Sequence, residues 1–108
     1  MGRTARISSF PDGRAVVHLA GELDIATAHP TRGVLRCAAA VSPHLLVDLT
    51  EVEFMDCAGL GALMWAHHKV TAAGGAVELL GPNWQVRKLI DAAGLNETLR
   101  VVPDLLRA

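Results

Sequence analysis

The first quarter of the chain alternates apolar and polar residues in the way that predicts a β-hairpin. Residues 3–10 and 15–20 are two strand candidates, of which the second is richer in apolar and β-branched residues. Between them, Pro11-Asp12-Gly13 predicts a turn, because Gly13 can adopt a positive φ without steric cost. The chain is therefore expected to open with two antiparallel strands.

Three later segments also read as strands. Residues 45–49 form an apolar run that only Asp48 interrupts, which is typical of a central strand buried on both faces of a parallel sheet. Residues 76–80 predict another strand, and residues 98–102 a short final one.

Between these strands, apolar residues recur every three or four positions, which predicts helices over 27–40, 57–73 and 84–93. Thr27 and Asn83 are candidate N-caps, and Gly74-Gly75 ends the second helix. A helical stub is expected at 103–108. The side chains predicted to face the core are Thr31, Val34, Leu35, Ala38 and Val41 in the first helix, Leu60, Leu63, Met64, His67 and Val70 in the second, and Val86, Leu89, Ile90 and Ala93 in the third.

Alternating strands and helices after a hairpin predict an α/β domain with a mostly parallel sheet. The length of 108 residues suits one domain, residues 1–108. If strands 15–20 and 45–49 are parallel neighbours, their carboxyl ends lie at one edge. The loops Gly21–Asp24 and Asp56–Gly61 would then lie side by side, at the edge where open α/β sheets carry their sites.

Composition narrows the classes of function. The net charge is −1 and basic residues never form a run, so neither a nucleic-acid nor a membrane-surface partner is expected. No apolar stretch is long enough to span a bilayer, and Met1–Phe10 lacks the apolar core of a signal peptide. We therefore expect a cytoplasmic protein.

Three motifs in order carry a family resemblance. They are Gly21-Glu22-Leu23-Asp24, then Phe54-Met55-Asp56-Cys57-Ala58-Gly59-Leu60-Gly61, and finally Val86-Arg87-Lys88-Leu89-Ile90-Asp91-Ala92-Ala93-Gly94-Leu95. Together they resemble the STAS domain, and more narrowly the bacterial anti-sigma factor antagonists.

That resemblance implies a protein-binding switch. Such antagonists bind an anti-sigma factor that is also a serine kinase with the histidine-kinase-like ATPase fold, and so release the sigma factor. The kinase phosphorylates a Ser directly after the acidic residue of the second motif, which breaks the complex. The positions carried over as partner-binding are Glu22, Asp24, Asp56, Cys57, Ala58, Gly59, Leu60 and Gly61.

The sequence departs from the family at the phosphorylated position, where Cys57 stands in place of Ser and Ala58 follows. No hydroxyl remains in 56–61, so phosphorylation of this loop by a serine kinase is not expected. Cys57 is either an inert small residue or a thiol switch that replaces phosphorylation. A disulfide with Cys37 is not expected, because Cys37 lies nearly three turns into its helix, roughly 15 Å from the edge that carries Cys57.

Two alternatives stay open at individual residues. Asp24 and Asp56 could cap the segments that follow them, contact a partner, or do both, whereas Glu22 reads as a solvated turn residue. Trp65 lies on the helical wheel with Ala58, Gly61, Ala62, Lys69 and Ala72, away from the Leu60/Leu63/Met64 stripe. It is either an interface anchor or covered by another helix of the domain.

We expect no metal, cofactor or catalytic site. His67 and His68 are adjacent and point about 100° apart on a helix, so they cannot chelate one ion together. Ser8, Ser9 and Ser42 lack the G-x-S-x-G context of a hydrolase, and Gly59-Leu60-Gly61 lacks the spacing of a phosphate loop. The oligomeric state is left open.

Overall fold

Five strands lie side by side in chain order in the computed structural model of the protein, which describes residues 5–103. β1 (Ala5–Ser9) is antiparallel to β2 (Ala15–Leu23). β3 (His44–Met55), β4 (Ala76–Leu80) and β5 (Arg100–Val102) continue the sheet in parallel with β2. The predicted hairpin and the mostly parallel α/β sheet are confirmed.

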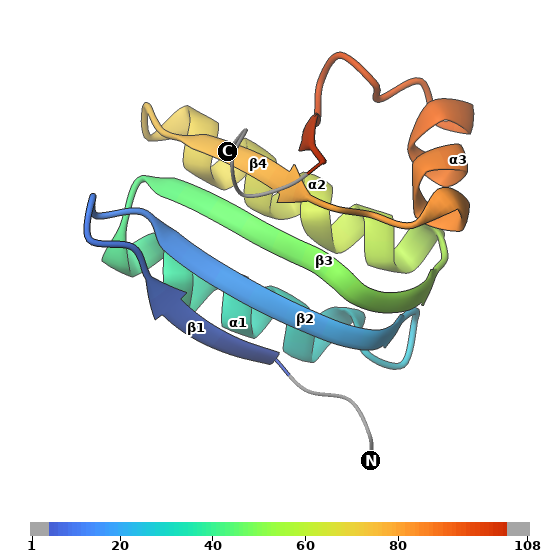
Figure 1. Ribbon diagram of the computed structural model, residues 1–108, viewed down its shortest axis with the longest axis horizontal. Coiled ribbons are helices and arrows are strands. Elements are labelled where there is room, and N and C mark those ends of the chain that lie inside the picture. The colour runs from blue at the N-terminus through green and yellow to red at the C-terminus, as the bar shows by residue number, and fades with distance from the viewer. Residues whose placement is uncertain (1–4, 104–108) are drawn as a thin grey trace.

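The three helices divide between one face of the sheet and one of its ends. α1 (Ala28–Val41) and α2 (Cys57–Ala72) lie together against the same face, and α3 (Trp84–Ala92) stands at the carboxyl end of β4, at the right of the view (Figure 1). Each of the parallel strands β2 and β3 therefore delivers the chain to the same edge before a helix begins.

A large apolar core lies between the sheet and the helices α1 and α2, and a smaller cluster lies on the opposite face. Because side chains alternate along a strand, Val17 and Val47 lie in the large core, whereas Val16 and Leu46 lie in the smaller cluster. The central strands are therefore buried on both faces, as predicted. The largest fully buried side chains are Leu19, Leu23, Leu35, Leu45, Leu46, Leu49, Met55, Leu63, Leu79, Ile90, Leu99 and Val16.

β3 is much longer than the predicted 45–49. Irregularities in its pairing with β2, between His18 and Ala20 and between Gly21 and Glu22, let the two strands continue until Leu23 lies opposite Met55. The exposed residues Glu51 and Glu53 belong to this extension. A strand with bulges loses strict alternation, which is why the sequence pattern ended it early.

The buried face of α2 differs from the predicted stripe. Leu60, Leu63 and Val70 are buried as expected, but Ala62 and Ala66 are buried in place of Met64 and His67, which are half-buried. α2 packs against α1 as well as the sheet, and small side chains allow this close approach.

The side-chain caps expected at the starts of α2 and α3 are present, whereas the one expected at the start of α1 is absent. Asn83 caps α3, because its side chain accepts a hydrogen bond from the Val86 N–H at 2.9 Å. Thr27 precedes α1 but makes no side-chain cap, so that prediction is wrong; its hydroxyl instead donates to the Glu22 carbonyl at 3.0 Å. The stub predicted at 103–108 lies, apart from Pro103, outside the described residues.

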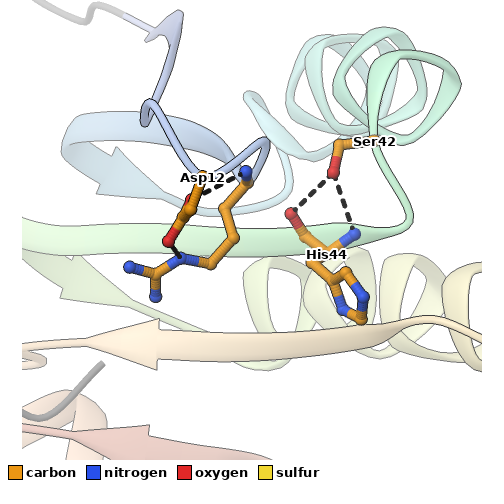
Figure 2. A network of polar contacts seen from close by, with 4 residues as sticks. Asp12, Ser42 and His44 are labelled. Atoms are coloured by element: carbon orange, nitrogen blue, oxygen red, sulfur yellow. Dashed lines mark hydrogen bonds and ion pairs between the residues drawn. The ribbon is translucent and has the colours of Figure 1, made fainter.

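At the amino end of the parallel strands, polar side chains pair within the chain (Figure 2). Ser42 is 4% exposed, and its hydroxyl accepts from the His44 N–H at 3.1 Å and donates to the His44 carbonyl at 3.2 Å. Asp12 pairs with the Arg14 guanidinium at 3.1 Å. Within 5–103, none of the helices is both long and apolar enough to cross a membrane.

Candidate functional site

The two motifs meet at the carboxyl edge of β2 and β3, as the sequence predicted. The loop expected at 21–24 is shorter than predicted, because Gly21, Glu22 and Leu23 still belong to β2, so Glu22 is a strand residue and not a turn residue. The Asp56 N–H donates to the Leu23 carbonyl at 3.1 Å. Gly59 presses against the same carbonyl, because a Cβ at Gly59 would lie 2.2 Å from it. Only glycine allows this approach, which fixes the start of α2 against the loop that follows β2.

Asp56 caps α2. Its Oδ1 accepts hydrogen bonds from the N–H groups of Ala58 at 2.9 Å and Gly59 at 3.1 Å. These groups belong to the first turn of the helix, whose N–H groups otherwise lack partners. The capping alternative for Asp56 is therefore confirmed, and its Oδ2 makes no hydrogen bond to the described part of the chain.

Asp24 organises the loop before α1. Its Oδ1 accepts from the Ala26 N–H at 3.0 Å, and its own N–H donates to the Thr27 hydroxyl at 3.0 Å. The Asp24 carbonyl accepts from the N–H groups of Thr27 and Ala28. This loop therefore has a defined shape, with Glu22 exposed beside it.

The predicted site residues of α2 divide between exposed and buried positions. Cys57, the first residue of the helix, is exposed and carries a free thiol, as does Cys37. Ala58 and Gly61 are half-buried, whereas Gly59 and Leu60 are buried and support the turn from inside. Of the set, Cys57 presents its side chain to solvent.

Trp65 lies apart from this edge. It is eight positions beyond Cys57, about 12 Å along the helix axis, and is half-buried and packed against the main core. The Arg36 guanidinium of α1 lies 5.6 Å from its ring and the Lys69 ammonium 6.0 Å. Part of the indole is therefore used within the domain, and its role in partner binding stays a prediction.

Sequence reasoning missed the hydrogen bonds that join α3 to this edge, although it recognised Asn83 as a cap. Asn83 donates from Nδ2 to the Val52 and Glu53 carbonyls at 3.1 Å each. Gln85 donates to the Met55 carbonyl at 2.8 Å and accepts from the Met55 N–H at 2.9 Å. These bonds join positions about thirty residues apart, so no local pattern signals them.

A second polar cluster lies on the sheet face opposite α1 and α2. Ser8 Oγ lies 2.9 Å from His18 Nε2, and His18 Nδ1 lies 2.8 Å from Asp48 Oδ2. Burial raises the pKa of the Asp48 carboxyl, but hydrogen bonds from Thr50 and the contact with His18 outweigh it and hold the pKa below its usual value. The chain of bonds ties β1 to β2 and β3 across the sheet.

Comparison with known proteins identifies this architecture. Residues 7–108 match the sequence profile of the STAS domain, so the sheet order and the paired loops at its carboxyl edge are those of a STAS-type α/β domain. The chain belongs to the STAS-domain family.

Several of the proteins to which the chain is similar are anti-sigma factor antagonists. An anti-sigma F factor antagonist of Paenibacillus polymyxa is 27% identical over 100 residues, which cover 89% of this chain and 84% of that protein. The crystal structure of an anti-sigma factor antagonist from Mycobacterium paratuberculosis is 28% identical, with a TM-score of 0.86 over 96% of this chain and 88% of that one. The phosphorylated form of Bacillus SpoIIAA has the same fold, with a TM-score of 0.72 and 22% identity over 93% and 92% of the two chains.

Proposed function

We propose that this protein is an anti-sigma factor antagonist that binds a serine-kinase anti-sigma factor of the histidine-kinase-like ATPase fold and so releases a sigma factor. The observation that carries the proposal is the junction of the Asp24 loop with the start of α2, fixed by Gly59 against Leu23. The names of its relatives in Paenibacillus and Mycobacterium support the same reading.

The proposal includes a change in regulation. A phosphate at the first residue of α2 would add roughly −1.5 to −2 charge beside Asp56 and Asp24, and like charges in a partner contact oppose binding. The side chain at that position is the exposed Cys57 thiol, and residues 56–61 contain no hydroxyl. The complex with the kinase is therefore expected to persist in ATP.

A second regulatory reading rests on the exposure of Cys57. An exposed thiol is accessible to peroxide, which would oxidise it to sulfenic acid with release of water and so place a polar group where the family carries phosphate. Cys37, which is also exposed and free, is the matched control for reactivity. If peroxide modifies Cys57 before Cys37 and weakens binding of the kinase, this reading replaces that of an inert residue.

The sharpest test of the phosphorylation switch is Cys57→Ser. Ser differs from Cys by one atom, so the cap at Asp56 and the turn at Gly59 are retained. With the cognate kinase and ATP, the Cys57→Ser protein should become phosphorylated and then dissociate, while the natural protein stays bound in both ADP and ATP. Intact-mass spectrometry and size-exclusion chromatography measure the two outcomes.

Cys37→Ser is the control variant, because it adds the same hydroxyl at an exposed position of α1 away from the edge. It should gain no phosphate. A Cys57→Ser protein that binds the kinase but is never phosphorylated would overturn the phosphoswitch reading. Absence of binding to every purified anti-sigma kinase of the native host would overturn the proposed function itself.

A further inference from the structure

Large apolar side chains are exposed around the start of α2, and two of them, Ile25 and Trp84, lie outside the family motifs. Ile25 is 82% exposed, Phe54 42% and Trp84 73%. They come from the loop after β2, the end of β3 and the start of α3, which all lie at the carboxyl edge (Figure 1). Within 5–103, the other exposed large apolar residues are Ile7 and Val41, which lie on β1 and at the end of α1.

These three side chains are presented by well-fixed backbone. Phe54 lies in β3 opposite Glu22 of β2. Trp84 stands between Asn83 and Gln85, whose side chains bind the backbone of β3, and Ile25 follows Asp24 in its hydrogen-bonded loop. A binding surface that is already ordered loses little conformational entropy when a partner docks.

The same edge carries an excess of negative charge. The three ion pairs of the described residues are Asp12–Arg14, His18–Asp48 and Glu78–Arg100. The carboxylates at the edge take part in none of them. Near Trp84 the positive groups are Arg87 and Lys88, and the Lys88 ammonium lies 4.9 Å from the indole centre. Near the start of α2 the positive group is Arg32, whose Nη2 would lie 3.8 Å from a Cβ on Gly61. The carboxylates of the edge are Glu22, Asp24, Glu51, Glu53 and Asp56.

We propose that Ile25, Phe54 and Trp84 form a docking surface for the partner, bordered by carboxylates around Ile25 and Phe54 and by Lys88 at Trp84. The partner then presents an apolar patch whose Lys and Arg side chains face the carboxylates. The inference rests on the proposed function and extends its contact area from the start of α2 to α3. A second copy of this chain fits less well, because a twofold interface would place the same carboxylates opposite one another.

The first experiment measures the dissociation constant for each purified anti-sigma kinase of the native host, by calorimetry with the full chain. Ile25→Ser and Trp84→Ser should each weaken binding by about tenfold or more, as expected for apolar anchors. Val41→Ser is the matched control, since Val41 is a β-branched residue 71% exposed at the far end of α1. It should bind as the natural protein does. Unchanged melting temperatures show that each variant is folded.

The second experiment tests the charge of the partner. Reversal of Glu22 and Glu53 to Lys should lower the association rate about tenfold at low salt, and added salt should shrink this difference. Glu97→Lys, a reversal in the turn after α3, should leave the rate unchanged.

The outcomes separate this inference from the proposed function. If no anti-sigma kinase binds the natural protein, both fail. If the natural protein binds but Ile25→Ser and Trp84→Ser behave as Val41→Ser does, the docking surface alone is wrong. A natural protein that is dimeric in sedimentation, and that Trp84→Ser makes monomeric, would assign the surface to a second copy and overturn the proposal.

Discussion

The backbone is packed closely at both the amino and the carboxyl ends of the parallel strands, but polar side chains are paired at the first end, whereas carboxylates at the second have no ion-pair partner within residues 5–103. At the amino end, a Cβ on Gly75 would lie 1.9 Å from the Pro43 carbonyl, and at the carboxyl end one on Gly59 would lie 2.2 Å from the Leu23 carbonyl. Around Pro43, Ser42 satisfies both polar groups of the His44 backbone (Figure 2).

At the carboxyl end the tight packing is the same, but exposed groups remain. Trp84 and Ile25 face solvent, and the carboxylates of Glu22 and Glu53 have no ion-pair partner in the described chain. Tight packing is therefore a requirement of the fold at both ends. Several unpaired carboxylates beside more than one exposed large apolar side chain distinguish the end proposed to bind.

The largest expected effect comes from Gly59→Ala. The new methyl group would overlap backbone atoms of Leu23, which cannot move aside as a flexible side chain could. We expect a loss of about 3 kcal/mol or more in the free energy of unfolding. Gly61→Ala is the control, since its Cβ would lie 3.8 Å from the Arg32 Nη2; it should be neutral or stabilising by up to about 1 kcal/mol. Urea unfolding measures both, and equal stability of the two variants would contradict the close contact.

The sequence was sufficient for the order of elements and for the meeting of the two loops. The apolar run at 45–49 marked a strand buried on both faces, and the Gly-Glu-Leu-Asp and Asp-Cys-Ala-Gly segments then had to share an edge. Asp56 and Asn83 were recognisable as caps because capping is local chemistry, which the residue type and its position reveal.

The part of the surface formed by β3 and α3 could not be predicted. The predicted strand ended at residue 49, before Glu51 and Glu53, because the pattern cannot show that bulges carry the strand past them. The hydrogen bonds that hold α3 at this edge join Gln85 to Met55 across thirty positions. The exposure of Trp84 depends on that long-range placement, so the predicted helix 84–93 gave no sign of it.

A smaller effect should separate the two roles of Asp56. Asp56→Ala removes the cap of α2 and should cost about 1 kcal/mol of stability. Asp56→Asn keeps a capping oxygen, so its stability should be near that of the natural protein while the charge at the edge is lost. If Asp56 also contacts a basic partner, Asp56→Asn weakens binding of the anti-sigma kinase, measured by calorimetry.

Ser42→Ala gives the comparison at the amino end. It removes a hydroxyl that is buried and doubly bonded, so a comparable loss of about 1 kcal/mol is expected, with binding unchanged. If Ser42→Ala weakened binding of the anti-sigma kinase as much as Asp56→Asn does, the assignment of the two ends would be contradicted. The loss of affinity would then depend on the loss of stability and not on where the residue lies.

The smallest expected effect concerns acid, and it tests whether pairing inside the sheet matters more than pairing at its surface. The pKa of Asp48 is held below its usual value of about 3.9, with burial opposing and the bonds from Thr50 and His18 prevailing. As the pH falls through about 4, the unfolded chain takes up a proton at this residue before the folded chain does, so the folded state loses stability. That contribution is present above this pH and disappears below the folded pKa. Asp48→Asn should therefore flatten the fall in melting temperature between about pH 5 and pH 2.

Asp12 is the control for this prediction. The Arg14 backbone N–H and guanidinium also lower the pKa of Asp12, but this residue is fully exposed, so salt screens its ion pair and Asp12→Asn should change the slope less. A larger change from Asp12→Asn than from Asp48→Asn, at both low and high salt, would contradict the stabilising role given to the polar chain across β1, β2 and β3.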